Sequence, residues 1–141
     1  MSVPTLILDT NVVVSALRSS LGASHRLIQL LDEGAFEIGL TAPLVFEYEA
    51  VCKRGVTPLT AEDVDRFIDY LCRVGKRSVV HFQVRPNLTD PDDEMILEAA
   101  VASDSEWIVT HNVRDLAAGS SRFGVEVLTP ADALRRMGVT R

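Results

Sequence analysis

Runs of apolar residues alternate along this chain with segments in which apolar residues recur at helical spacing. The run from Val3 to Leu8 has the length and character of a strand buried on both faces, as in parallel sheets. Four later segments also have strand character, and the further strands are expected at residues 36–40, 78–84, 107–110 and 125–128.

The segments between these strands favour helices, which are expected at 12–18 and 24–33 and from residues 41, 60, 90 and 129 onward. Residues 12–18 are ambiguous, because three consecutive valines favour a strand and the following residues favour a helix. We expect a helix there, since the preceding strand has already run its length. Thr60 and Asp63 have the spacing of a capping box. Strands alternating with helices predict a single domain over residues 1–141, a three-layer α/β/α fold around a central, mostly parallel five-stranded sheet.

The amino-acid composition and net charge indicate a globular protein and argue against several other classes. Apolar residues make up 47% and charged residues 24%, as in an ordinary globular protein. No apolar run approaches the roughly 18 residues of a membrane-spanning helix, and no signal-peptide pattern is present. We therefore expect a cytoplasmic protein without membrane contact, with Cys52 and Cys72 reduced. The net charge of −6 argues against broad electrostatic adhesion to nucleic acid, but not against an enzyme whose acids surround metal ions.

Asp9 follows the first strand directly. Ligands of parallel sheets bind beyond the carboxyl ends of the strands, so this position suits an acid that holds a cation. An aspartate after a strand is equally common as the cap of the next helix. Both interpretations stand at this point.

The helix that begins near Pro43 carries two acids, Glu47 and Glu49. They flank its apolar face on opposite sides, so periodicity does not decide which one points towards a site. Either acid can equally be a solvated surface residue.

Asp93 lies in line with an apolar stripe. It precedes Ile96, Leu97, Ala100 and Val101 by three, four, seven and eight residues, so it falls at the centre of their face. A carboxylate in that place is costly without a partner. A helix cap, with Asp90 at the N-cap position, explains why acids crowd here but not why one is aligned with the core.

Asn112 and Asp115 follow the fourth expected strand and are competing candidates for a ligand. Their spacing is that of a capping box, so either residue can instead be structural.

Four segments together resemble the PIN-domain family of ribonucleases, which includes the VapC-like toxins of bacterial toxin–antitoxin pairs. These segments are LILDTN, TAPLVFEYEAV, DPDDEMILEAAVA and WIVTHNVRDL, and they follow the family's order over nearly the whole chain. No single segment is specific, whereas four at these separations are. The resemblance implies a PIN-like fold.

The resemblance also implies the site residues. By position, it prefers Glu47 to Glu49, and Asp93 to Asp90 or Asp92. Many members have aspartate where this chain has Asn112, so Asp115 or Asn112 is implied as the fourth group. The expected catalytic and metal-binding residues are Asp9, Glu47, Asp93 and Asp115. The residues expected to orient ligands or water are Thr10, Asn11, Thr110 and Asn112.

The implied activity is endonucleolytic hydrolysis of single-stranded or looped RNA with Mg²⁺ or Mn²⁺. Hard divalent cations prefer oxygen ligands, and clustered carboxylates repel one another unless a cation is bound. Arg18 and Arg114 are candidates for phosphate contact. Family analogy implies a protein antitoxin, and the apolar residues of helices 24–33 and 60 onward suffice for a homodimer, although core burial explains them equally.

Other classes of protein fit less well. Haloacid-dehalogenase-like phosphatases need a second aspartate where Asn11 stands, and no glycine-rich phosphate loop is present. The remaining alternative is a PIN-like protein that binds partners without cleaving RNA.

Overall fold

Five parallel strands form the central sheet in a computed structural model that describes residues 3–80 and 91–139. The strands are β1 (Thr5–Leu8), β2 (Glu37–Leu40), β3 (Lys76–Arg77), β4 (Trp107–Val109) and β5 (Glu126–Leu128). Their order in the sheet is β3-β2-β1-β4-β5, and every neighbouring pair is parallel. β1 is therefore central, and its residues Leu6, Ile7 and Leu8 are fully buried, as the apolar run predicts.

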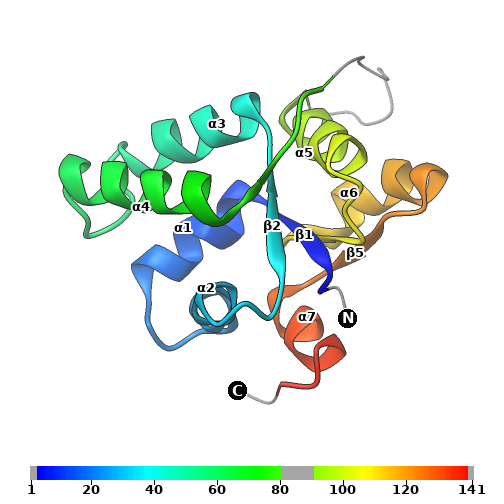
Figure 1. Ribbon diagram of the computed structural model, residues 1–141, viewed down its shortest axis with the longest axis horizontal. Helices are drawn as coiled ribbons and strands as arrows, with labels where there is room; N and C mark the ends of the chain where they lie inside the picture. The colour runs from blue at the N-terminus through cyan, green and yellow to red at the C-terminus, as the bar shows by residue number, and fades with distance from the viewer. Residues whose placement is uncertain (1–2, 81–90, 140–141) are drawn as a thin grey trace.

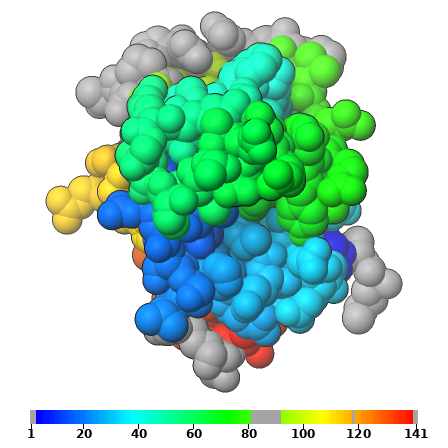
Figure 2. All heavy atoms as spheres, turned by 90° about the vertical axis from the view of Figure 1, so that its left-hand side faces the viewer, coloured from blue at the N-terminus to red at the C-terminus, as the bar shows by residue number. Residues whose placement is uncertain are grey.

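Helices cover both faces of the sheet. They are α1 (Thr10–Arg18), α2 (Ala23–Asp32), α3 (Ala42–Cys52), α4 (Ala61–Val74), α5 (Pro91–Ala102), α6 (Val113–Ser120) and α7 (Pro130–Arg136), with a short 3-10 helix at Ser121–Phe123. Figure 1 shows α1 to α4 on one side and α5 and α6 on the other, and α7 packs against α2. Figure 2 looks onto the side formed by α1 to α4. The predicted three-layer α/β fold is confirmed.

Helix α1 resolves the ambiguity of the three valines. The Asp9 carbonyl accepts the backbone amides of Val12 and Val13 at 2.9 and 3.2 Å, so the helix starts immediately after β1. Both valines are fully buried. Burial of their side chains in the helix outweighs their weak preference for a strand.

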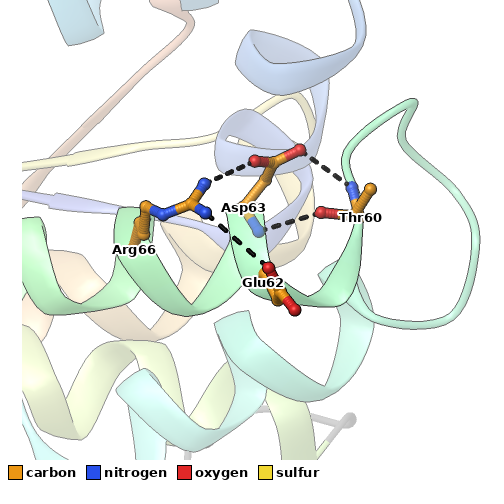
Figure 3. A network of polar contacts seen from close by, with 4 residues as sticks. All are labelled: Thr60, Glu62, Asp63 and Arg66. Carbon is orange, nitrogen blue, oxygen red and sulfur yellow. Dashed lines mark hydrogen bonds and ion pairs between the residues drawn. The ribbon is translucent and has the colours of Figure 1, made fainter.

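Threonine caps fix the starts of several helices. The Thr60 hydroxyl accepts the amide of Asp63 at 3.1 Å, and the Asp63 carboxylate accepts the amide of Thr60 at 3.2 Å (Figure 3). Arg66 adds ion pairs with Asp63 at 2.8 Å and Glu62 at 3.7 Å. The predicted capping box is therefore present. Helices α3 and α7 start at side-chain caps of the same kind, Thr41 and Thr129.

The third strand differs from its predicted position at residues 78–84. β3 is Lys76–Arg77, the next three residues are not in a strand, and the rest of the predicted segment lies outside the described residues. The chain enters the sheet directly after α4, where Gly75 packs so closely that an added Cβ would lie 2.5 Å from Leu40 Cδ1. Both residues of this edge strand are charged and exposed, so an apolar pattern does not mark it.

The end of α5 lies close against the sheet. A Cβ added at Gly39 of β2 would lie 2.7 Å from Ser103 Oγ and 2.8 Å from Ile7 Cδ1. The Ser103 hydroxyl donates to the Ala99 carbonyl at 2.8 Å, and Lys76 Nζ donates to the Ser103 carbonyl at 2.7 Å. The missing side chain at Gly39 therefore sets how closely α5 approaches the sheet.

Two composition-based expectations concern membranes and cysteines. In the part of the chain that the structure describes, no helix has the length and apolar character needed to cross a membrane. Cys52 is buried, Cys72 is half-buried, and both are free thiols.

Candidate active site

The candidate site begins where β1 and β4 end side by side. The backbone amide of Asp9 donates to the Val109 carbonyl at 2.9 Å. Thr110 follows β4, and its hydroxyl donates to Asp9 Oδ2 at 2.7 Å. The same hydroxyl oxygen accepts the backbone amide of Asn112 at 3.0 Å. The Asp9 carboxylate is thus held by the neighbouring strand end, where parallel sheets bind their ligands.

Asp9 also occupies the N-cap position of α1, but its side chain makes no capping hydrogen bond within the described residues. Only 9% of the residue is exposed. Burial raises the pKa of Asp9, and the negative charge of Asp92 raises it further. Hydrogen bonds from Thr110 and the Thr10 backbone and the charge of His111 lower this pKa, but burial has the largest effect. Capping alone therefore does not account for a carboxylate kept in this buried place.

Asp9 lines a pocket of about 800 Å³ to which α1, α3 and α5 contribute. Among the described residues, four carboxylates line this pocket, and they belong to Asp9, Glu47, Asp92 and Asp93. Thr10, Asn11 and Asn112 also line it, whereas Thr110 is fully buried and hydrogen-bonded to Asp9. The structure therefore brings together three of the four predicted catalytic acids.

Helix α3 is fixed beside the end of β1 by Tyr48. This residue is fully buried, and its hydroxyl donates to the carbonyl of Leu8. The preceding residue, Glu47, lines the pocket. Glu49 instead forms an ion pair with Lys53 at 2.9 Å and is not among the described lining residues. The structure thus separates the two acids that periodicity leaves equivalent.

Helix α5 presents two acids to the pocket, the half-buried Asp93 and the exposed Asp92. The predicted N-cap, Asp90, lies outside the described residues. Glu94 and Glu98 are 3% and 9% exposed, which the predicted apolar stripe does not anticipate. Their burial follows from the contacts of α5 with three strands and with α3 and α6, which cover more than one stripe of the helix.

Asp115 is the predicted catalytic acid that the described lining of the pocket does not include. It is exposed on α6. Asn112 does line the pocket, and its side chain makes no capping hydrogen bond within the described residues. Of the two candidates for the fourth position, the structure brings Asn112 to the acids.

The carboxylates act on one another electrostatically. Burial raises the pKa of Glu47, the negative charges of Asp92 and Asp9 raise it further, and Arg54 acts in the opposite direction. Asp92 likewise raises the pKa of Asp9. A cation among these side chains would relieve the repulsion.

The donor atoms fit a hard divalent cation, because carboxylate and amide oxygens are its preferred ligands. Within residues 3–80 and 91–139, no group of three acids, histidines or cysteines is arranged to hold a metal ion. Mg²⁺ usually keeps several waters and uses one or two carboxylates. The carboxylate and amide groups that line the pocket therefore suffice as a donor set for a hydrated Mg²⁺ ion.

Sequence reasoning did not assign His111 to the site. This residue lines the pocket, and its backbone amide donates to Asn11 Oδ1 at 3.4 Å. In the sequence, His111 is not grouped with other histidines or cysteines. Its position directly after Thr110, at the end of β4, is the signal that could have identified it.

A family model described as PIN domain matches residues 5–114, and the chain therefore belongs to the PIN-domain family. PIN domains are generally nucleases. The resemblance drawn from the four sequence segments is thus confirmed. The matched range includes Asp9, Glu47, Asp93 and Asn112 and ends one residue before Asp115.

Among solved structures, the chain is similar to one in the crystal structure of VapBC2 from Rickettsia felis bound to a DNA fragment from their promoter. The TM-score is 0.60 at 14% sequence identity, and the match covers 87% of this chain and 96% of that chain. At this identity the likeness concerns the fold. No curated protein matches the chain.

Proposed function

We propose that this protein is a metal-dependent endoribonuclease that hydrolyses phosphodiester bonds of single-stranded or looped RNA. The observation that carries the proposal is the meeting of Asp9, Glu47 and Asp93 around one pocket, although they come from a strand end and two separate helices. Family membership supports it independently, since PIN domains are generally nucleases.

In this proposal, Asp9, Glu47 and Asp93 bind Mg²⁺ or Mn²⁺ through their carboxylate oxygens, either directly or through waters that the ion keeps. Asn112 is favoured over Asp115 as the fourth group because it lines the pocket. A bound ion would lower the pKa of its water and offset charge on the phosphodiester oxygens. Thr110 orients Asp9 through its hydrogen bond, and Thr10 and Asn11 orient water or ligands at the pocket wall.

We further propose that the protein is the toxin of a toxin–antitoxin pair, with a protein antitoxin as its partner. The sequence resemblance to VapC-like toxins and the fold shared with a chain of the VapBC2 structure support this. A cytoplasmic location and a homodimer belong to the same proposal. The apolar residues of α2 and α4 that suggested a dimer, such as Leu27 and Leu71, are buried in the core, so core packing accounts for them and the homodimer stays a prediction.

The test is cleavage of a labelled single-stranded RNA and an RNA hairpin by purified protein with Mg²⁺ or Mn²⁺. Asp9→Asn and Asp93→Asn should strongly reduce cleavage, because each removes a charged ligand. Glu49→Gln is the matched control, since it removes a carboxylate from α3 outside the pocket. Undiminished cleavage by both aspartate variants would refute the assigned roles.

Calorimetric titration with Mn²⁺ distinguishes the enzyme from a PIN-like binding protein. The proposed enzyme binds the ion saturably, and Asp9→Asn weakens binding. Absence of saturable binding together with absence of cleavage would favour the binding protein.

A further inference from the structure

The pocket extends along α1, away from the acids. The lining residues of α1 and its C-cap form pairs one turn apart: Thr10 and Asn11, Val14 and Ser15, Arg18 and Ser19. This spacing puts them on one face of the helix. The helix has nine residues. At about 1.5 Å per residue, this face covers about 13 Å. The far end of the pocket is therefore well separated from Asp9.

Arg18 gives this far end the opposite charge. Among the described residues that line the pocket, it is the only lysine or arginine. It forms no ion pair with another described residue, whereas Arg26 and Arg66 pair with Glu33 and Asp63 at 3.1 and 2.8 Å. Arg18 is thus an available partner for a phosphate, which the carboxylates at the other end repel.

Three valines line the pocket and form an apolar wall: Val14 of α1, which lies between Thr10 and Arg18 on that helix, Val51 of α3 and Val56 in the loop after α3. Val56 is 40% exposed. Helices α1 and α3 pack against each other, and both lie on the side of the molecule that faces the viewer in Figure 2. A hydrated Mg²⁺ fills on the order of 200 Å³, taking about 30 Å³ per water. The pocket volume of about 800 Å³ therefore leaves room for a nucleotide beside the wall.

We propose that Arg18 holds an RNA backbone phosphate next to the scissile one, while the attached nucleoside lies against the wall of Val14, Val51 and Val56. This inference rests on the proposed RNA substrate and names the part of the same pocket that binds it. Contact through phosphate and apolar surface does not read the base, so binding at this position depends little on sequence.

Arg18 also lies in the last turn of α1, where a positive charge is favourable for the helix dipole. That role alone predicts a small loss of protein stability for Arg18→Gln and no change in RNA binding. The two roles are therefore separated by measuring the melting temperature and RNA affinity of the same variant.

The experiment measures fluorescence anisotropy of a labelled single-stranded RNA over a range of KCl concentrations with Mg²⁺, using Asp9→Asn protein to prevent cleavage. Adding Arg18→Gln should weaken binding about tenfold. It should also reduce the slope of log affinity against log salt by about 0.7, the value for one phosphate contact to a single strand. Arg18→Lys should keep the slope, and Val56→Ser should weaken binding about threefold with the slope unchanged.

Arg73→Gln is the matched control. Arg73 lines a separate hollow on α4 with Arg66 and Arg77, and its loss changes net charge by the same amount. An unchanged slope for Arg18→Gln, or an equal reduction for Arg73→Gln, would overturn the inference. Cleavage of RNA by the wild-type protein decides the proposed function separately. If the wild-type protein cleaves RNA and Arg18→Gln binds RNA as tightly as the protein with Arg18, the inference about Arg18 is wrong while the proposed function stands.

Discussion

The end of β1 and the start of α5 bring acids to the same pocket by different means. Asp9 is buried, and Thr110 of the neighbouring strand end holds its carboxylate at 2.7 Å. Asp92 is exposed in the first turn of a helix. A strand end thus fixes a desolvated carboxylate in one direction, whereas a helix end offers solvated ones. We expect Asp9 to be the acid on which metal position depends most.

The sharpest test of this difference compares Asp9→Asn with Asp92→Asn. We expect single-turnover cleavage to fall by a factor on the order of 10³ for Asp9→Asn and only about tenfold for Asp92→Asn. Rates are measured with labelled RNA at saturating Mg²⁺. Equal losses would remove the distinction between strand-end and helix-end acids.

The next largest effect is expected from removing the hydrogen bond between Thr110 and Asp9. Thr110→Val removes the hydroxyl but keeps the shape, so Mn²⁺ affinity measured by calorimetry should fall about 10- to 100-fold. Thr110→Ser keeps the hydroxyl and should bind nearly as well as the wild type. Unchanged affinity in the valine variant would mean that Asp9 needs no such support.

The hydrogen bond from Tyr48 to the Leu8 carbonyl, which fixes α3 beside β1, should contribute to the stability of the protein. Tyr48→Phe leaves the buried Leu8 carbonyl without its donor, and we expect the free energy of unfolding in urea to fall by about 1–3 kcal/mol. Tyr70→Phe is the matched control, because the Tyr70 hydroxyl donates to Asp32 at 3.0 Å on the exposed surface. A similar loss for both variants would contradict a special role of the buried bond.

The desolvation of Asp9 should also appear in the pH dependence of stability without metal. Its pKa is raised in the folded protein, so the folded state keeps this proton at pH values where the unfolded chain has lost it. The resulting destabilisation is full above the raised pKa and vanishes as the pH falls to the ordinary value of 3.8. Asp9→Asn should therefore stabilise the protein in EDTA at pH 7, and urea denaturation should show this gain shrinking towards acid pH. A gain that grows on acidification would contradict the burial of the charge.

The smallest effect is expected at Glu49. Its ion pair with Lys53 lies on the surface, where Lys53 also contacts Asp65 at 2.6 Å. Glu49→Gln should change the free energy of unfolding by less than about 0.5 kcal/mol and leave RNA cleavage unaltered. A marked loss of cleavage would place Glu49 in the site after all.

The fold could be predicted for segments in which buried positions carry apolar residues in a regular pattern. Leu6, Ile7 and Leu8 mark the central strand because both of its faces are covered. The charged strand β3 carries no such pattern, since its position depends on the close packing of Gly75 and Leu40. The burial of Glu94 and Glu98 was missed for a related reason, because periodicity describes one covered face and α5 has several.

Three of the four acids predicted for the site line the pocket, whereas the sequence pattern alone does not give the directions of their side chains. Asp9 is identified by its place at a strand end. Periodicity leaves Glu47 and Glu49 equivalent, and only the family resemblance prefers Glu47. The Tyr48 hydrogen bond and the Lys53 ion pair that separate the two acids join residues in ways that periodicity does not describe. The inclusion of Asn112 and exclusion of Asp115 likewise depend on how the chain turns between β4 and α6.

The glycine at position 39 has a consequence for the geometry of the candidate active site. Its bare backbone lets the carboxyl end of α5 rest on β2, while Asp92 and Asp93 sit at the other end of that helix. A methyl group at Gly39 would press on the side chains of Ser103 and Ile7, and any shift of α5 that relieved this contact would also move Asp92 and Asp93 at the pocket. If the proposed metal binding is confirmed, variants with altered metal preference can therefore be sought at Gly39, a strand residue that is not among the described lining residues of the pocket.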